Sequence, residues 1–231
     1  MTELSAIDIK ENIAKIKTEV AEFADKYARN INDVQIMAVT KRTEPKFINI
    51  AVSHGIKLIG ENRAQELVSK YDALVLKKES IHFIGYLQIN KIKSIIDKVS
   101  MIHSADSIKF INALDNQMKK RESVMDCLVQ INIGNEPTKS GILQEETEEF
   151  LKNASKFENV NIKGLMAIPP PSNSDLYFGR MQKLFVDIKD KNIDNINMEI
   201  LSMGMSNDYL EAVKYGSNII RIGTKIFGTR L

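Results

Sequence analysis

The chain has 231 residues, of which 43% are hydrophobic and 27% are charged, and this ordinary composition excludes collagen-like, coiled-coil and wholly disordered proteins. Lys and Arg total 32 and Asp and Glu total 30, so the net charge of +2 gives no strong attraction to nucleic acid or to an anionic membrane. The apolar runs are far shorter than the ~20 residues of a membrane span, and the first residues lack the pattern of a secretory signal. The single cysteine, Cys127, cannot form an internal disulfide, and we therefore expect a cytoplasmic protein.

The apolar residues alternate between helical and strand-like patterns along the chain. Ile13, Ile16 and Val20 recur at helical spacing and predict a helix over 6–29. Thr43 is the expected N-cap of a second helix that continues to about 53. Further amphipathic stretches predict helices at 63–73, 106–118, 144–156 and 174–189. Short apolar segments predict strands at 34–39, 57–60, 81–85, 101–103, 125–133, 162–166, 198–201 and 218–220.

Eight short strands that alternate with helices indicate a parallel sheet with the helices outside it. Eight such units in about 200 residues suit a closed (β/α)8 barrel of the TIM type, here with an extra N-terminal helix before the first strand. We expect a single domain over 1–231, because no linker rich in Gly, Ser or Pro interrupts the pattern. The alternative is an open doubly wound sheet, although the glycine fingerprint of dinucleotide-binding folds is absent.

Functional residues of such a barrel lie where its strands end and the following loops begin. Lys41 comes directly after the segment Ala38-Val39-Thr40, at the end of the first predicted strand. Burial of its aliphatic stem would make the amine easier to deprotonate, and a neutral amine can form a Schiff base with an aldehyde. The alternative is an ordinary solvated lysine, since the chain contains 25 lysines.

A second group of candidate residues follows the last two predicted strands. Ser206 lies where a helix is expected to begin, and Gly223 and Thr224 follow the final strand. Backbone N–H groups at the start of a helix attract anions, and barrels often bind phosphate in their last two loops. These three residues therefore predict a phosphate site. A simple N-cap at Ser206 and a turn at Gly223 are the alternatives.

Two further polar residues follow predicted strands. Arg221 ends the last strand, where a buried guanidinium needs an inward carboxylate, or else a ligand anion or ring nitrogen, as its partner. Asn62 follows another strand, and it either contacts a ligand or caps the next helix. His82 and His103 fit satisfied core histidines, and we expect no metal site because no side chains have the spacing of metal ligands.

Several segments carry a resemblance to a known family. They are AVTKRTEP, LIGENRAQEL, HFIGYLQINK, QINIGNEPTKSGI, IKGLMAIPP and LSMGMSNDYLEAVKYGSNIIRIGTKIFGTR. With these segments the chain, over about 5–230, resembles the pyridoxal-phosphate homeostasis proteins. That family is similar to the N-terminal barrel of alanine racemase standing alone, without the C-terminal β-domain of the racemase. The SMGMS-ND and RIG-T-IFG-R patterns are the most specific part of the resemblance.

The resemblance implies a site for pyridoxal 5′-phosphate. It implies that Lys41 carries this cofactor as a Schiff base and that Arg221 faces the pyridine nitrogen. The other contacts that it implies come from Asn62 and Met203 in the pocket and from Ser206, Gly223 and Thr224 at the phosphate. Tyr86 and Ile89 depart from the Pro or His and the Ser that are usual in the family, so ligand contacts at these two positions are not carried over.

The resemblance also implies a cofactor carrier or buffer in vitamin B6 homeostasis, with no catalytic residue and no turnover. Racemisation needs acid–base groups on both faces of the cofactor. Alanine racemase takes one of these groups from its C-terminal β-domain, and this sequence ends soon after the last predicted strand. The alternatives are a weak pyridoxal-phosphate-dependent amino-acid racemase and a barrel lyase or aldolase that binds a sugar phosphate. We expect a monomer with pyridoxal-phosphate-dependent apo-enzymes as candidate recipients, and no nucleic-acid or membrane partner.

Overall fold

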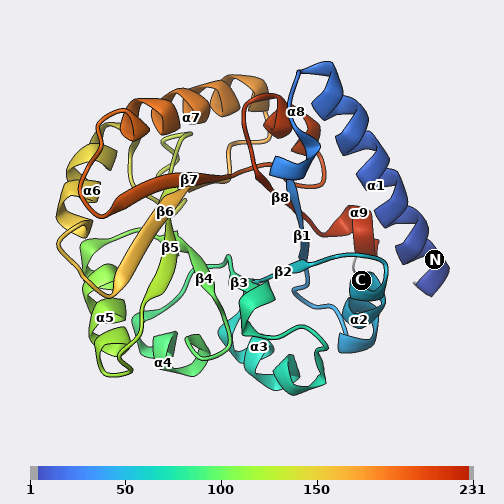
Figure 1. Ribbon diagram of the computed structural model, residues 1–231, viewed down its shortest axis with the longest axis horizontal. Coiled ribbons are helices and arrows are strands. Elements are labelled where there is room, and N and C mark those ends of the chain that lie inside the picture. Colours follow the sequence, from blue (N-terminus) through green and yellow to red (C-terminus); the bar gives the residue numbers. More distant parts are fainter. Residues whose placement is uncertain (1–4, 229–231) are drawn as a thin grey trace.

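Parallel strands form a closed barrel in the computed structural model, which describes residues 5–228 (Figure 1). The strands are β1 (Gln35–Val39), β2 (Leu58–Glu61), β3 (Ile81–Phe83), β4 (Met101–Ala105), β5 (Met125–Ile131), β6 (Val160–Ala167), β7 (Ile196–Ser202) and β8 (Ile219–Ile222). Each strand pairs in parallel with the next, and β1 closes the barrel by pairing with β8. The predicted barrel is therefore confirmed, and the open sheet is wrong.

Helices surround the strands as an outer ring (Figure 1). They are α1 (Ala6–Lys26), α2 (Pro45–Ser53), α3 (Ala64–Lys70), α4 (Ile92–Ile95), α5 (Ile108–Lys119), α6 (Thr147–Ala154), α7 (Ser174–Lys189), α8 (Tyr209–Lys214) and α9 (Thr224–Phe227). Helix α1 is the predicted addition before the first strand, and the Ser5 hydroxyl caps it by accepting the N–H of Asp8. Among residues 5–228, no helix has the length and apolar character needed to cross a membrane.

The predicted N-cap of α2 is wrong. Glu44 occupies the N-cap position and Pro45 begins the helix, because proline has no N–H to satisfy in the first turn and its fixed φ suits that position. The hydroxyl of Thr43 instead donates to the carbonyl oxygen of Lys41 at 3.4 Å. The residues between β1 and α2 therefore form a tight turn around Lys41, and this turn belongs to the candidate site.

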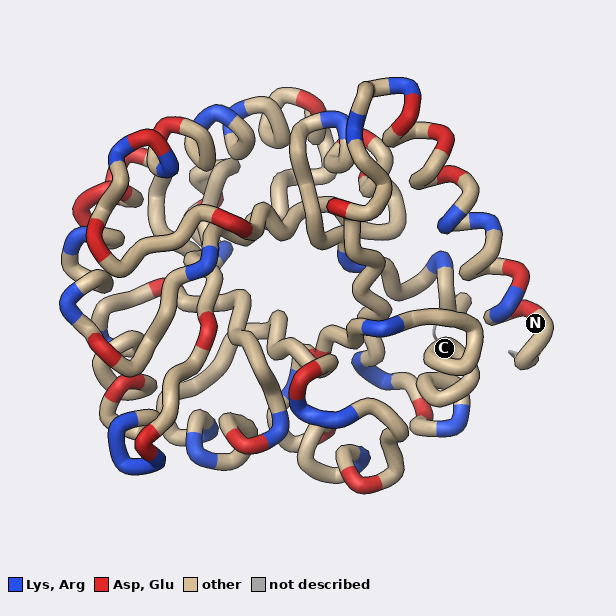
Figure 2. Tube along the Cα trace, viewed as in Figure 1, with Lys and Arg blue, Asp and Glu red and all other residues tan. Residues whose placement is uncertain are grey.

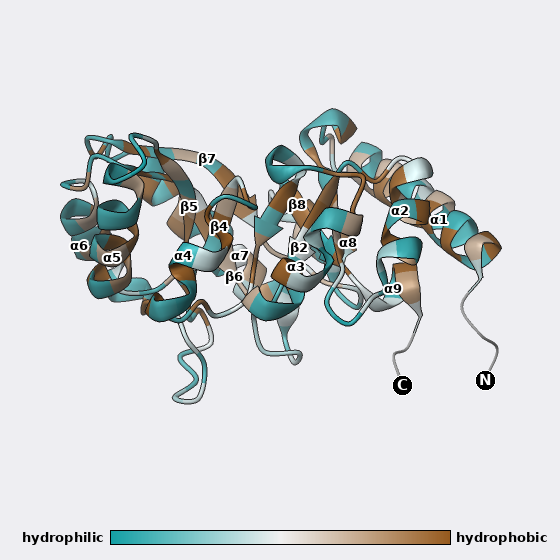
Figure 3. Cartoon of the chain, turned by 90° about the horizontal axis from the view of Figure 1, so that it is seen from below, coloured by the Kyte–Doolittle hydropathy of each residue, from teal (hydrophilic) through white to brown (hydrophobic). Residues whose placement is uncertain are grey.

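Side chains of the strands alternate between two hydrophobic regions. Met37 and Val39 of β1 pack inside the barrel, whereas Ala38 belongs to the larger core between the barrel and the helices. Figure 3 shows the complementary pattern on the helices, whose hydrophobic segments alternate with hydrophilic ones. Figure 2 shows Lys and Arg interspersed with Asp and Glu along the outer helices, in agreement with the small net charge.

Candidate functional site

Lys41 lies at the carboxyl end of the barrel, two residues beyond the end of β1. β1 ends at Val39, and residues 41 and 42 form a turn in which Lys41 is exposed. The burial of the aliphatic stem that would ease deprotonation of the amine is therefore not found. Lys41 is therefore open to solvent at the residue level.

The loops after β7 and β8 meet at the hydroxyl of Ser206. Ser206 is buried, and its Oγ accepts the backbone N–H of Gly223 at 3.3 Å and that of Lys225 at 3.4 Å. The N-cap alternative for Ser206 is wrong, because Asp208 occupies the N-cap position of α8. Thr224 follows Gly223 and is exposed at the start of α9. The two backbone N–H groups donate to Ser206 Oγ in this structure, so the serine hydroxyl and these N–H groups form a cradle of polar groups shared by the two loops.

Gly204 lets the loop after β7 turn back toward β8. Its φ is +89°, and a Cβ added there would lie 2.5 Å from the Cβ of Ala212 and 3.0 Å from the Cα of Tyr209. A residue with a side chain would therefore be both strained and too close to α8. The carbonyl oxygen of Gly204 accepts the backbone N–H of Arg221 at 3.0 Å, which ties the two loops of the cradle together.

Arg221 points into the barrel from β8 and is only 3% exposed. Its Nη1 donates to Ser202 Oγ at 2.7 Å, and its Nη2 donates to the carbonyl oxygen of Ala167 at 2.8 Å. Burial lowers the pKa of Arg221 to about 10, so the guanidinium stays charged at neutral pH. No ion pair joins Arg221 to a carboxylate within residues 5–228, so the salt-bridge alternative is wrong for the described part of the chain.

Ser202 connects Arg221 to two buried histidines. Arginine can only donate, so Ser202 Oγ accepts from Arg221. Ser202 Oγ also lies 3.2 Å from His103 Nδ1, and His103 Nε2 lies 2.9 Å from His82 Nδ1. Each of these two contacts is a hydrogen bond whose donor is set by the tautomers of the histidines.

Both histidines are neutral at physiological pH. Burial lowers the pKa of His82 to about 4 and holds the pKa of His103 well below its usual value, with further lowering from the charge of Arg221. The prediction of satisfied core histidines is confirmed. Ser202 belongs to the segment LSMGMSND that carries the resemblance, but its bond to Arg221 was not predicted, although the two-residue alternation that places Arg221 inside the barrel could have identified an inward polar partner on β7.

Asn62 and Met203 occupy different environments. Asn62 is half-buried after β2, beside a shallow pocket of ≈ 320 Å³ that Tyr86 also lines. Arg63 is at the N-cap position of α3, so the cap alternative for Asn62 is wrong. Met203 follows the last residue of β7 directly and is fully buried in the core between the strands and the helices. Its contact with the cofactor stays a prediction.

Asp106 is a further polar residue at the mouth of the barrel. It follows Ala105, the last residue of β4, and burial raises the pKa of its carboxyl although a hydrogen bond with Ser107 opposes the shift. The sequence analysis missed this residue because it ended the predicted strand at residue 103, and β4 extends two residues further. A half-buried carboxyl at this edge is a candidate acid or base.

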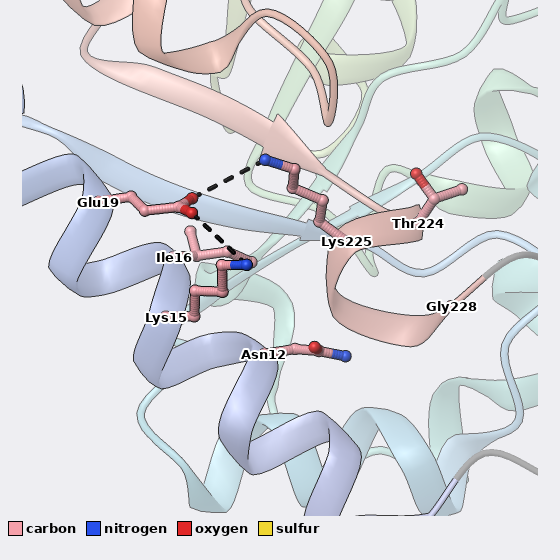
Figure 4. Close-up of a pocket in the computed structure, with 7 residues that line it drawn as sticks. All are labelled: Asn12, Lys15, Ile16, Glu19, Thr224, Lys225 and Gly228. Carbon is pink, nitrogen blue, oxygen red and sulfur yellow. Dashed lines mark ion pairs between the residues drawn. The ribbon is translucent and has the colours of Figure 1, made fainter.

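Helix α1 is tied to the phosphate-type cradle through Glu19, which lies beside a pocket of ≈ 300 Å³ (Figure 4). Glu19 accepts a hydrogen bond from the hydroxyl of Tyr209 and forms ion pairs with Lys225 at 3.8 Å and Lys15 at 4.0 Å. Tyr209 begins α8 and Lys225 follows Thr224, so these contacts reach both loops of the cradle. Helix α1 therefore helps to hold the loops after β7 and β8 in position.

Residues 5–228 contain no group of three His, Cys, Asp or Glu side chains that could hold a metal ion. Cys127 is fully buried within β5, and burial raises the pKa of its thiol.

Comparisons with known proteins agree with this geometry. The family model for the N-terminal domain of alanine racemase matches residues 9–231. A pyridoxal phosphate homeostasis protein of Aquifex aeolicus is 34% identical over 224 residues, which is 95% of this chain and 97% of that relative. The structure of PipY from Synechococcus elongatus with PLP bound has a TM-score of 0.82 and 28% identity, over 95% of this chain and 100% of PipY.

A crystal structure of an unknown protein from Bifidobacterium adolescentis is similar over 98% of both chains, with a TM-score of 0.91 and 26% identity. The matches extend along the whole barrel and include both the Lys41 turn and the loops after β7 and β8. The chain therefore belongs to the alanine racemase N-terminal domain family and, within it, to the pyridoxal phosphate homeostasis proteins.

Proposed function

We propose that this protein binds pyridoxal 5′-phosphate at Lys41 and holds it as a carrier or buffer in vitamin B6 homeostasis. The observation that carries the proposal is the convergence of three groups at one edge of β7, β8 and β1. These groups are the amine of Lys41, an exposed residue, the cradle at Ser206 and Gly223, and the buried guanidinium of Arg221. The names of the relatives and the PLP bound to PipY support the same ligand.

The described residues fit the chemical groups of this cofactor. A phosphate is a strong acceptor, and the hydroxyls of Ser206 and Thr224 are donors at the same place. The backbone N–H groups of Gly223 and Lys225, which donate to Ser206 Oγ in this structure, lie beside them and would turn to the phosphate when it binds. The buried charge of Arg221 has no paired carboxylate within residues 5–228, so it offers a donor to a ring nitrogen. Asn62, half-buried after β2, completes the proposed contacts.

When bound, pyridoxal phosphate supplies an aldehyde that condenses with a primary amine with loss of one water molecule, and a ring that withdraws electrons. Lys41 supplies that amine from an accessible turn. Arg221 can only donate, so it favours a ring nitrogen without a proton and thereby limits electron withdrawal. His103 uses both ring nitrogens for hydrogen bonds to His82 and Ser202, which leaves neither free to exchange a proton with a substrate. These features support binding without turnover.

We also propose that 1–231 acts as one domain, as a monomer in the cytoplasm, with pyridoxal-phosphate-dependent apo-enzymes as recipients. Residues 1–4 and 229–231 at the two ends of that domain lie outside the described residues. A weak amino-acid racemase is the second candidate function. The carboxyl of Asp106 favours it, because burial at the barrel mouth raises its pKa and suits it to proton transfer.

An amino-acid turnover assay separates the two candidates. We expect the loaded protein, incubated with L-alanine and other L-amino acids in D2O, to form fewer D-amino acid molecules than there are protein molecules. Chiral chromatography and mass spectrometry measure the product and its deuterium content, with Lys41→Ala as the unloaded control. Sustained racemisation that Asp106→Asn abolishes would contradict the carrier proposal and establish the racemase.

A further inference from the structure

Three charged side chains lie together on the outer side of the barrel, directly behind the turn that carries Lys41. Glu61 is 0% exposed at the end of β2, and Lys70 and Glu66 of α3 are 6% and 22% exposed. Lys70 Nζ lies 2.7 Å from Glu61 Oε1 and 2.9 Å from Glu66 Oε1. We refer to Glu61, Glu66 and Lys70 as the charge cluster.

The charge cluster holds both chain neighbours of Lys41. On one side, Lys70 Nζ donates to the carbonyl oxygen of Thr40 at 2.8 Å, and the hydroxyl of Thr40 donates to Glu61 Oε1. On the other side, the backbone N–H of Arg42 donates to Glu66 Oε1. The peptide groups on both sides of Lys41 are therefore anchored to charged atoms, and hydrogen bonds to charged groups are the stronger kind.

The arrangement is costly, which indicates that the geometry it enforces matters. Arg42 has a φ of +56°, a left-handed conformation that a residue with a side chain adopts only when its surroundings require it. Glu61 Oε2 is buried without a hydrogen-bond partner among the described residues. Replacing a whole buried ion pair by apolar residues is often neutral or stabilising, so stability alone does not account for the charge cluster.

We propose that Glu61, Glu66 and Lys70 are positioning residues, which fix the Lys41 turn so that its amine approaches an incoming aldehyde from a single direction. These three side chains do not contact the cofactor themselves. They act on Lys41 only through their hydrogen bonds to Thr40 and Arg42. This inference rests on the proposed function of Lys41. A preorganised nucleophile reacts faster because less conformational freedom is lost when it meets its partner.

Glu66 offers the sharpest test, because its removal leaves the buried Glu61–Lys70 pair in place. We expect Glu66→Ala to slow covalent loading with pyridoxal phosphate about tenfold, since the acceptor for the Arg42 N–H is lost. Glu66→Gln keeps an oxygen acceptor at that position and should load at a rate close to wild type. Stopped-flow absorbance of the lysine-bound cofactor gives the rate, and hydrogen exchange of the Arg42 amide reports the loosened turn.

A destabilised variant elsewhere provides the control. Leu114→Ala removes a fully buried side chain of α5 and should lower stability without slowing loading. Equal loading rates for Glu66→Ala and Glu66→Gln would overturn the positioning role, and so would equal slowing in Leu114→Ala. If wild-type protein does not load at all, the proposed function of Lys41 is wrong, and this outcome is distinct from the other two.

Discussion

Replacing Lys70 with methionine is expected to lower the free energy of unfolding by about 3–5 kcal/mol, because the substitution leaves a buried carboxylate without its partner. Glu61 is fully buried and lies 2.7 Å from the ammonium group of Lys70. Burial already raises the pKa of Glu61, and the nearby charge of Lys70 opposes that shift. Without Lys70 the carboxyl must either take up a proton or remain as an isolated charge. Urea unfolding at pH 7 measures the loss.

Two further variants make this prediction specific. Lys183→Met breaks an exposed ion pair with Asp187, whose members are 74% and 49% exposed, and should change stability by less than about 1 kcal/mol. The double variant Glu61→Gln with Lys70→Met removes both buried charges and should recover part of the lost stability. A Lys70→Met protein as stable as Lys183→Met would show that the buried pair does not have the energetic role assigned to it.

The stability of the protein is expected to fall by about 3 kcal/mol between pH 7 and pH 4 through His82 alone. In the unfolded chain His82 takes up a proton near its ordinary pKa of 6.5, whereas burial lowers the pKa in the folded protein to about 4. The unfolded state therefore binds more protons throughout this window, so acid favours unfolding. His103, whose pKa is also lowered, adds to the loss with the same sign.

The carboxyls of Glu61, Asp106 and Asp208 oppose the effect of the histidines, because burial raises their pKa values and acid protonates them in the folded state first. A histidine variant isolates the contribution of His82 to the loss of stability in acid. His82→Asn keeps a side-chain amide, which can either donate to or accept from His103 Nε2, and should remove about 3 kcal/mol of the acid loss. His54→Asn, at the end of α2, is the matched control. If both variants show the same pH dependence as wild type, the buried His82–His103 pair is not its source.

The barrel and several of its site residues could be predicted because each strand, and the residue that follows it, can be recognised from a short stretch of sequence. Strand segments have short apolar runs, and residues that follow them lie at one edge of a parallel barrel, which is how Lys41, Ser206 and Arg221 were identified. Local signals also led to errors. Burial of the Lys41 stem was considered because Lys41 follows an apolar run, whereas the chain enters a turn at residues 41 and 42 in which Lys41 is exposed.

Contacts between distant elements could not be predicted in the same way. His82, His103 and Ser202 come from β3, β4 and β7, and only closure of the barrel brings them together. Glu61 and Lys70 are close in sequence, but their pairing depends on the outward alternation of β2 and the position of α3 against it. Such partners are determined by tertiary packing, for which composition and periodicity carry no direct signal.

Borohydride reduction followed by peptide mass spectrometry tests the central claim most directly. Protein incubated with pyridoxal phosphate should show an absorbance band that borohydride removes, and digestion should place one reduced secondary-amine link on Lys41 among the 25 lysines. Lys41→Ala should retain no specific link, although its loops after β7 and β8 are unchanged. Labelling of a different lysine, or no labelling with excess cofactor, would contradict the assignment of Lys41 as the cofactor-bearing residue.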